Sequence, residues 1–171
     1  MEEIQLYETE SAHLRFRRLR ADDFTAVAAI LRGGQMENDG AQPLSYGETV
    51  DWLADNLRGG EEGCGWLAAT LRDGGAVAAL CGLMHGDGDA RELRCIVRAD
   101  LRQQGVGAEC AQAMLAYAFG AGKAARVESF IPQGNMAALR TAAACGMKPV
   151  GQCERGGMPH LVCAVEAEAR K

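Results

Sequence analysis

The alternation of apolar and polar positions predicts a chain of short strands mixed with helices. Residues 13–19 alternate apolar and charged side chains, which is typical of a strand with one buried face. Residues 21–32 instead place apolar side chains three and four positions apart, which is the spacing of a half-buried helix. The same patterns predict these elements in order: strand 13–19, helix 21–32, a helix from Ser45 through Leu57, strands 65–71 and 76–84, a strand around 93–97, a helix between Gly107 and Gly120, strand 125–131, a helix from Asn135 to Cys145, and strands 149–153 and 160–165.

Turn signals separate these elements. Ser45 and Glu48 have the spacing of a capping box, which begins the second helix, and Gly59-Gly60 is expected to end it. Asp73-Gly74 lies between two apolar runs and predicts a hairpin. No internal repeat or change of composition divides the chain, so we expect one domain over residues 1–171, with a core over about 12–167.

Composition and charge point away from nucleic acid and from membranes. The formal net charge is −5, and the one basic run, residues 15–20, alternates with apolar residues as on the solvated face of a strand. Nucleic-acid binding needs a strongly basic face, so no nucleic-acid partner is expected. The first residues are acidic and lack a hydrophobic signal core, and no apolar run approaches membrane-spanning length. The sequence therefore predicts a cytoplasmic protein without a membrane segment.

The cysteines indicate reduced thiols and not a metal site. There are seven, an odd number without a C-x-x-C pair, and most lie in apolar runs, as expected of a cytosolic protein. His160 and Cys163 are the nearest approach to a ligand pair, but a predicted strand makes them core residues. Asp87 and Asp89 have calcium-loop spacing, yet Arg91 stands where a third oxygen ligand would be needed, so a turn is expected.

Residues 92–120 carry the clearest candidate chemistry. An apolar run around Leu93–Val97 is followed by a loop with Gly105 and Gly107, and then by an alanine-rich helix. The first amide groups of a helix have no partner inside it, and the helix dipole makes that end partly positive. Glycines let an anion approach the backbone closely. The stretch therefore predicts a phosphate-binding cradle.

These residues resemble a known family. Arg102 to Gly107 match the R/Q-x-x-G-x-G/A signature of the GNAT acyl-CoA-dependent N-acetyltransferases, and the predicted element order is similar to their fold. The resemblance extends from Leu14 to about Val165 and is closest to the branch that contains ribosomal-protein N-terminal acetyltransferases. The further matches are Glu92 ten positions before Arg102, Glu109, Tyr117-Ala118-Phe119, Asn135, and Ala144-Cys145-Gly146-Met147 in place of K-L-G-F. It implies a single-domain α/β (α+β) acyl-CoA N-acyltransferase fold, with a mixed, mostly antiparallel sheet flanked by helices.

The resemblance implies acetyl-CoA as the cofactor. In the family the pantetheine arm lies along the strand like an added strand, which here is Cys95, Ile96 and Val97, with backbone bonds from Cys95 and Val97. Arg102 is then expected near the phosphates, and Asn135 matches the residue that bonds the cofactor arm. The backbone amides expected around the pyrophosphate are those of Gln103, Gln104, Gly105, Val106, Gly107 and Ala108.

Two residues are predicted to act in catalysis. The backbone amide of Cys95 is the candidate for polarising the thioester carbonyl, and no role as a nucleophile is predicted for its thiol. Glu92 is placed to accept the proton of the attacking amine, directly or through a water; the alternative is a structural or substrate-orienting carboxylate. Glu109, in the first turn of the helix, is expected to complement the helix dipole.

The general acid is missing from its usual places. Many relatives have a tyrosine where this chain has Ala142, and the nearest branch often has a serine where it has Ala138. Either water or another hydroxyl protonates the leaving thiolate, or the thiolate leaves unassisted, or catalysis is weak.

The leading hypothesis is therefore an acetyl-CoA-dependent N-acetyltransferase that acts on a protein N-terminus or a small amine by direct attack in a ternary complex. The alternatives are a non-catalytic acyl-CoA-binding sensor and a polyamine- or aminoglycoside-type acetyltransferase. Residues 33–45 and 154–159 are expected to line the acceptor side, because variable loops usually carry specificity. The oligomeric state stays open, with a homodimer as one alternative.

Overall fold

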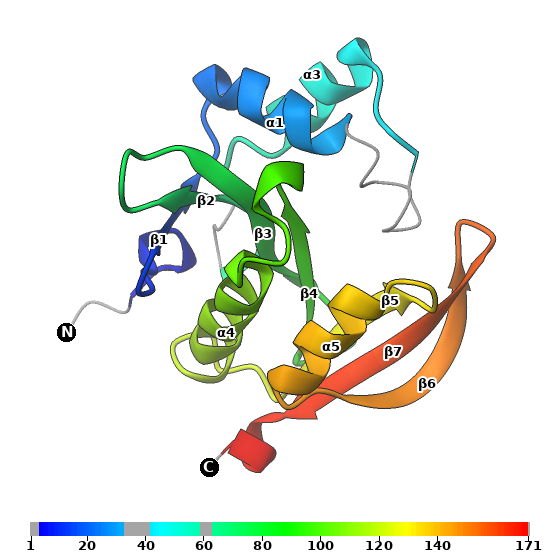
Figure 1. The fold of residues 1–171 in the computed structure, drawn as a ribbon. Coiled ribbons are helices and arrows are strands. Elements are labelled where there is room, and N and C mark those ends of the chain that lie inside the picture. Colours follow the sequence, from blue (N-terminus) through cyan, green and yellow to red (C-terminus); the bar gives the residue numbers. More distant parts are fainter. Residues whose placement is uncertain (1–3, 33–41, 59–62, 171) are drawn as a thin grey trace.

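The computed structural model describes residues 4–32, 42–58 and 63–170, which form a seven-stranded sheet with helices packed around it (Figure 1). The strand order is β1-β2-β3-β4-β5-β7-β6, and only the pairing of β4 with β5 is parallel. The strands are β1 Leu14–Arg18, β2 Gly65–Leu71, β3 Val77–His85, β4 Ala90–Val97, β5 Arg126–Pro132, β6 Lys148–Arg155 and β7 Met158–Glu166. The α-helices are α1 Phe24–Leu31, α3 Tyr46–Asp55, α4 Val106–Phe119 and α5 Met136–Ala144, and short 3₁₀ turns are η1 Leu6–Glu8, η2 Ala21–Asp23, η4 Ala99–Leu101 and η5 Ala167–Arg170.

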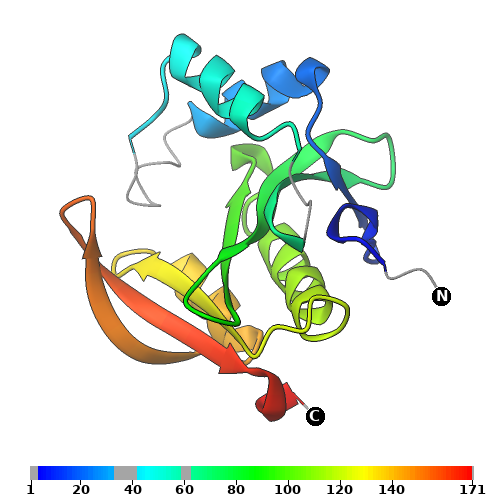
Figure 2. The same cartoon turned by 180° about the vertical axis from the view of Figure 1, so that it is seen from behind.

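Two apolar clusters fill the space between the sheet and its helices. Met114 and Leu115 of α4 are fully buried in the larger cluster, on the face that α4 and α5 cover. Val27 and Ile30 of α1 are buried in the smaller cluster, on the face toward α1 and α3. Burial of each such side chain stabilises the folded state by roughly 1.5–3 kcal/mol. Figure 2 shows the whole molecule from the side opposite to that of Figure 1. The predicted mixed, mostly antiparallel sheet with helices on both faces is confirmed.

Strand β4 contributes to both clusters because its side chains alternate between the faces. Leu93 lies in the cluster under α4, whereas Ile96 lies in the cluster under α1. Both faces of the strand therefore carry buried apolar side chains, although Arg94 on the second face is exposed.

The parallel pair β4 and β5 stays together over only a short length. Its register runs from Ala90 opposite Arg126 to Glu92 opposite Glu128. Beyond Glu92, β4 continues to Val97 beside β3, while β5 continues to Pro132 beside β7. The two strands therefore part toward their carboxyl ends and leave a gap in the middle of the sheet.

Several local predictions are confirmed by hydrogen bonds. The capping box is present, because the Ser45 hydroxyl accepts from the Glu48 amide at 3.2 Å and the Glu48 carboxylate accepts from the Ser45 amide at 2.7 Å. The helix predicted to begin at Asn135 is α5, and Asn135 caps it by accepting from the Ala138 amide at 3.2 Å. The hairpin between β2 and β3 turns through Gly74 and Gly75, at φ values of +86° and +74°.

Other boundaries were predicted wrongly. Helix α3 ends at Asp55, earlier than predicted, and Gly59-Gly60 lies outside the described residues. The last turn is only Gly156-Gly157, at φ values of +56° and +78°, so β6 and β7 extend further than expected. Two successive glycines with positive φ values form a two-residue hairpin turn. The polar residues on either side of them led to the prediction of a longer turn. Most of the predicted loop 33–44 also falls outside the described residues.

Candidate active site

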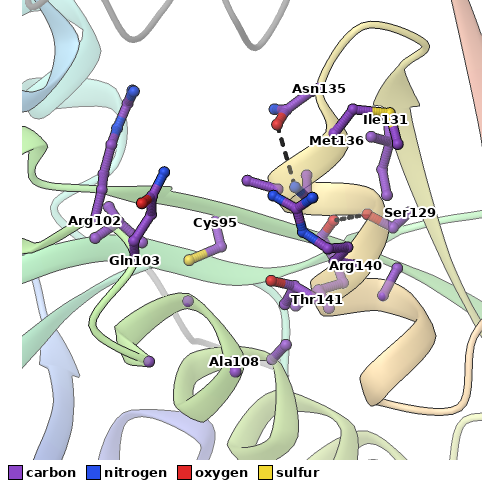
Figure 3. A pocket seen from close by; sticks show the side chains of 18 of the residues that line it. Cys95, Arg102, Gln103, Ala108, Ser129, Ile131, Asn135, Met136, Arg140 and Thr141 are labelled. Carbon is purple, nitrogen blue, oxygen red and sulfur yellow. Dashed lines mark hydrogen bonds between the residues drawn. The ribbon is translucent and has the colours of Figure 1, made fainter.

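A cavity of about 780 Å³ opens where β4 and β5 separate, and α4 and α5 complete its walls (Figure 3). Its lining combines β4 and β5 with the loop before α4 and one side of α5. The lining residues are Leu93, Cys95, Val97, Leu101, Arg102, Gln103, Gly105, Gly107, Ala108, Ala111, Ser129, Ile131, Gly134, Asn135, Met136, Ala137, Ala138, Arg140, Thr141, Ala142 and Met147. The cavity therefore brings together residues from two separate parts of the chain.

The backbone of β4 faces this cavity at alternate residues. The N–H of Arg98 donates to the Ala78 carbonyl at 2.9 Å, so even-numbered positions direct their backbone groups toward β3. The hydroxyl of Ser129 on β5 donates to the Leu93 carbonyl at 3.5 Å, so odd-numbered positions direct theirs toward β5. Cys95 and Val97 consequently present backbone N–H and C=O groups to the gap, as an extended ligand lying along the strand would require.

The loop before α4 forms the end of the cavity. Gly105 is the residue preceding the helix and has a φ of +86°, a conformation that suits glycine. A methyl group on Gly107 would lie 3.5 Å from the Val97 side chain, which is an ordinary packing distance and places the start of the helix against β4. The amino terminus of the helix Val106–Phe119 therefore lies beside the cavity, where its amide groups suit an anion.

Among the described residues, the charged side chains that line the cavity are both arginines. Figure 3 shows Arg102 on the loop side and Arg140 on the α5 side. The Nε and Nη2 atoms of Arg102 are buried and have no hydrogen-bond partner among the described residues. A guanidinium with two buried, unpaired donors is costly unless something supplies acceptors. The cavity is thus cationic in a chain whose net charge is −5, which suits a polyanionic ligand.

Helix α5 contributes residues that the sequence analysis missed. Asn135, Ala138 and Ala142 were considered there, but Arg140 and Thr141 also line the cavity. Both lie within two turns of the Asn135 cap, so the spacing of a helical face could have suggested them. Thr141, and Ser129 on β5, place hydroxyl groups at this site.

Some predicted contact residues do not line the cavity. Ile96 packs into the smaller apolar cluster, and its even position turns its backbone toward β3. Gln104 is exposed and donates to the Asp100 carbonyl at 2.9 Å, while Val106 packs against the larger cluster. Their contacts with a cofactor stay predictions.

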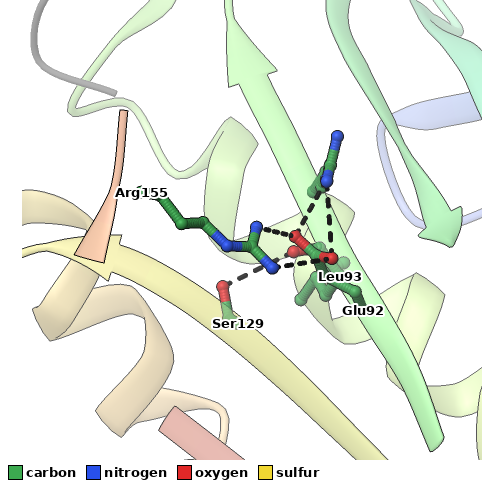
Figure 4. A network of polar contacts seen from close by, with 5 residues as sticks. Glu92, Leu93, Ser129 and Arg155 are labelled. Carbon is green, nitrogen blue, oxygen red and sulfur yellow. Dashed lines mark hydrogen bonds and ion pairs between the residues drawn. The ribbon is translucent and has the colours of Figure 1, made fainter. Parts of the chain in front are cut away.

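The Glu92 side chain lies on the face of β4 that is turned away from α4, where it forms ion pairs with two arginines (Figure 4). Oε1 accepts from Arg155 Nη1 at 2.8 Å and from Arg94 Nε at 2.9 Å, while Oε2 accepts from a second nitrogen of each arginine at 3.4 Å. Arg155 also stacks on the Phe130 ring, at 3.6 Å from its centroid. The β6–β7 hairpin is thereby tied to β4 and β5, across the place where those strands part.

The protonation state of Glu92 follows from this network. Burial, which leaves the residue 8% exposed, would raise its pKa. Hydrogen bonds from Arg155 and Arg94, together with their charges, outweigh burial and leave the pKa below its ordinary value. Glu92 is therefore ionised at neutral pH, which lets it accept a proton but makes it a weak base.

Glu109 has a structural position. It accepts from the Ser11 hydroxyl at 2.5 Å and from the His13 amide at 2.7 Å, so it ties α4 to the segment before β1. His160 and Cys163 are buried, at 4% and 2% exposure. No group of metal-ligating side chains occurs among the described residues.

A family model described as the acetyltransferase (GNAT) domain matches residues 13–148. This chain is a GNAT acetyltransferase. GNAT acetyltransferases use acetyl-CoA, so the predicted family, enzyme class and cofactor are confirmed. No curated protein matches the chain in sequence. Within the described residues, no helix is both long and apolar enough to cross a membrane.

Solved structures share the fold of this GNAT domain. A GNAT-family acetyltransferase from Bacillus anthracis has a TM-score of 0.85 at 18% identity, over 94% of this chain and 98% of that one. Ribosomal-protein-S5-alanine acetyltransferase from Vibrio fischeri has a TM-score of 0.75 at 12% identity, over 95% and 97%. The aminoglycoside acetyltransferase AAC(6')-Ib, solved in complex with coenzyme A, has a TM-score of 0.74 at 17% identity, over 92% and 98%. At these identities the likeness shows the fold alone.

Proposed function

We propose that this GNAT domain transfers the acetyl group of acetyl-CoA to a primary amine, by direct attack while both substrates are bound. The observation that carries the proposal is the open edge of β4, which adjoins a cavity lined by two arginines and the amino terminus of α4. The acceptor is a protein N-terminus or a small amine. A homodimer stays a prediction.

The residues present suit acetyl-CoA. The backbone groups of Cys95 and Val97 would bind the pantetheine arm, and the N–H of Cys95 would polarise the acetyl carbonyl. The amides at the start of α4 and the unpaired N–H groups of Arg102 would bind phosphates. Acetyl-CoA supplies the activated acetyl group, and Arg140 offers a second cation for its other phosphate.

Glu92 is the proposed proton acceptor, directly or through a water. Oε1 already accepts two short hydrogen bonds, which fill the usual capacity of one carboxylate oxygen. Oε2 has only long contacts of 3.4 Å, so it is the atom that would accept from an amine or a water. Glu92→Gln should lower kcat by about a hundredfold and leave acetyl-CoA binding unchanged, because the substitution removes the acceptor on the face opposite the cavity. A variant that keeps the full rate at every pH would assign Glu92 a structural role.

The charges around Glu92 favour an acceptor with a single amine. Arg94 and Arg155 flank the carboxylate, so the group of three carries a net charge of +1. A polycation such as an aminoglycoside or a polyamine would be repelled by both guanidiniums. A peptide N-terminus or a small monoamine meets less repulsion.

Thr141 is the proposed source of the proton for the leaving thiolate. It lines the cavity one position before Ala142, where many relatives have a tyrosine. Its hydroxyl would take the place of the general acid that is missing at Ala142 and Ala138, and that missing acid was the reason for considering a non-catalytic sensor. A threonine hydroxyl is, however, a weaker acid than a tyrosine hydroxyl. Weak turnover would be consistent with this difference.

The test measures thiol release from acetyl-CoA with a panel of N-terminal peptides, monoamines, polyamines and aminoglycosides. Release with a peptide or monoamine well above the polycations supports the proposal. Thermal stabilisation by acetyl-CoA without release on any acceptor would favour the sensor. No stabilisation at high acetyl-CoA would contradict every form of the proposal.

A further inference from the structure

Three cysteines meet on the face of the sheet beneath α4. Cys81 of β3 lies directly opposite Cys95 of β4 in the strand register. Cys110 of α4 packs onto the same face, and its thiol hydrogen-bonds with both of the others. None of the three forms a disulfide in the described structure. Neither the family nor the proposed reaction assigns them a common role.

The backbone spacing of Cys81 and Cys95 suits a disulfide. Cys95 directs its backbone groups away from β3, so the two residues form a non-hydrogen-bonded pair of the antiparallel ladder. The Cα atoms of such a pair are about 4.5 Å apart, and its side chains lie on one face. Disulfides need Cα separations of roughly 4.4–6.8 Å. The Cα separation of this pair therefore permits a bond between the two sulfurs.

The three thiols differ in their access to solvent. Cys81 and Cys110 are fully buried, at 0% exposure, whereas Cys95 is half-buried and lines the cavity. The hydrogen bond with Cys110 lowers the pKa of Cys81, but burial and the neighbouring Cys95 leave it raised. The hydrogen bond with Cys81 raises the pKa of Cys110, and burial adds to this effect. Cys95 is therefore the thiol that a small oxidant reaches first.

We propose that Cys81 and Cys95 form a reversible disulfide in the wall of the cavity when the protein meets a peroxide. The Cys95 sulfur attacks one peroxide oxygen, the O–O bond breaks, and a sulfenic acid and one water form. The Cys81 sulfur then attacks the Cys95 sulfur, and the sulfenic hydroxyl leaves with the Cys81 proton as a second water. Peroxide is reduced, two thiols are oxidised, and a dithiol reductant reverses the change.

The site also links oxidation to the cofactor. Cys95 is the residue whose backbone would bind the pantetheine arm, so bound acetyl-CoA would cover its thiol. This second part rests on the proposed function, whereas disulfide formation itself does not. Acetyl-CoA should slow disulfide formation about tenfold or more at saturation.

Trypsin makes the test direct, because each cysteine of the cluster lies in a separate peptide. The cuts after Arg72, Arg91, Arg94, Arg98, Arg102 and Lys123 place Cys81 in residues 73–91, Cys95 in 95–98 and Cys110 in 103–123. The full chain is treated with hydrogen peroxide, alkylated and digested without reductant. We expect residues 73–91 linked to 95–98, and an intact mass lower by two hydrogen atoms. Linkage through 103–123, or no linkage, would overturn the proposal.

Matched variants separate the partners. Cys110→Ala and the outlying Cys153→Ala should still form the disulfide, whereas Cys81→Ala should leave Cys95 open to a sulfenic-acid probe. Mapping of the wild-type chain decides the question even if a variant does not fold. A thermal-shift measurement run in parallel reports whether acetyl-CoA binds. If acetyl-CoA binds but does not slow disulfide formation, the idea that it covers the Cys95 thiol is refuted. If acetyl-CoA does not bind, the proposed function is refuted, and the result on disulfide linkage still stands.

Discussion

Arg102 offers a substitution with opposite effects on the protein alone and on its complex. Its Nε and Nη2 atoms are buried without hydrogen-bond partners in the described structure, although the side chain as a whole is half-buried. A buried unsatisfied donor costs about 1–3 kcal/mol, less where part of the group is solvated. Arg102→Met keeps the aliphatic packing and removes these donors. The ligand-free chain should therefore be as stable as the wild type, or up to about 1 kcal/mol more stable.

The complex should respond in the other direction. Charge-assisted hydrogen bonds contribute about 1.5–3 kcal/mol each, and the partial exposure of Arg102 argues for about 2 kcal/mol in total. That loss weakens acetyl-CoA binding about 30-fold. At acetyl-CoA about 100 times the wild-type Kd, the wild type gains about 2.7 kcal/mol of stability, and the variant only about 0.9 kcal/mol.

Urea unfolding with and without acetyl-CoA measures both effects in one experiment. Arg32→Met is the matched control, because Arg32 is exposed at the end of α1 and does not line the cavity. It should keep the full gain from the ligand. A gain for Arg102→Met within about 0.3 kcal/mol of wild type would show that Arg102 does not contact the cofactor. A less stable ligand-free variant would refute the reasoning about its unpaired donors.

Three further substitutions test other parts of the structure. Arg155→Met should destabilise the chain by about 1–2 kcal/mol at neutral pH, where Glu92 is ionised. This cost should begin to fall as the pH drops through the ordinary Glu92 pKa of 4.5 and should vanish only below the lowered pKa of the folded state; urea midpoints measured against pH would contradict this if the cost stayed constant. Thr141→Val should lower kcat roughly tenfold to a hundredfold without raising KM for acetyl-CoA, and an unchanged kcat in steady-state kinetics would remove Thr141 as the acid. Gly82→Ala should cost about 3 kcal/mol or more, because the added methyl would overlap the Gly65 carbonyl; a thermal melt matching wild type would show that β2 and β3 can move apart.

The elements of this fold could be predicted because their signals are local. Period-two and helical apolar patterns depend only on neighbouring residues, and they predicted all seven strands, with β1, β2, β3 and β5 within one residue of their observed bounds. The Ser45 capping box and the Asn135 cap use side chains within three residues of their partners, so they too were predictable. The boundaries failed where a tight glycine turn, Gly156-Gly157, lay inside a longer polar segment.

The candidate site could be predicted only in part, for a related reason. Cys95, Arg102 and Gly105 lie within one strand-loop-helix unit, and the structure brings them to one cavity. Arg140 and Thr141 come from a different helix, and their proximity depends on how α5 packs beside α4. The sequence alone offered no distance between those helices.

The strand periodicity and the loop signature by themselves predicted the family, the individual strands and a phosphate-binding loop, since each of these predictions uses only short stretches of sequence. Only the tertiary structure decided which residues share a face and where the sheet opens. The β6–β7 hairpin brings Arg155 to Glu92, which is 63 positions away in the sequence, and this contact lowers the pKa of the predicted base. The packing of α4 onto β3 and β4 likewise gathers Cys81, Cys95 and Cys110. Such contacts arise from the packing of whole elements, because no local pattern fixes how distant segments meet.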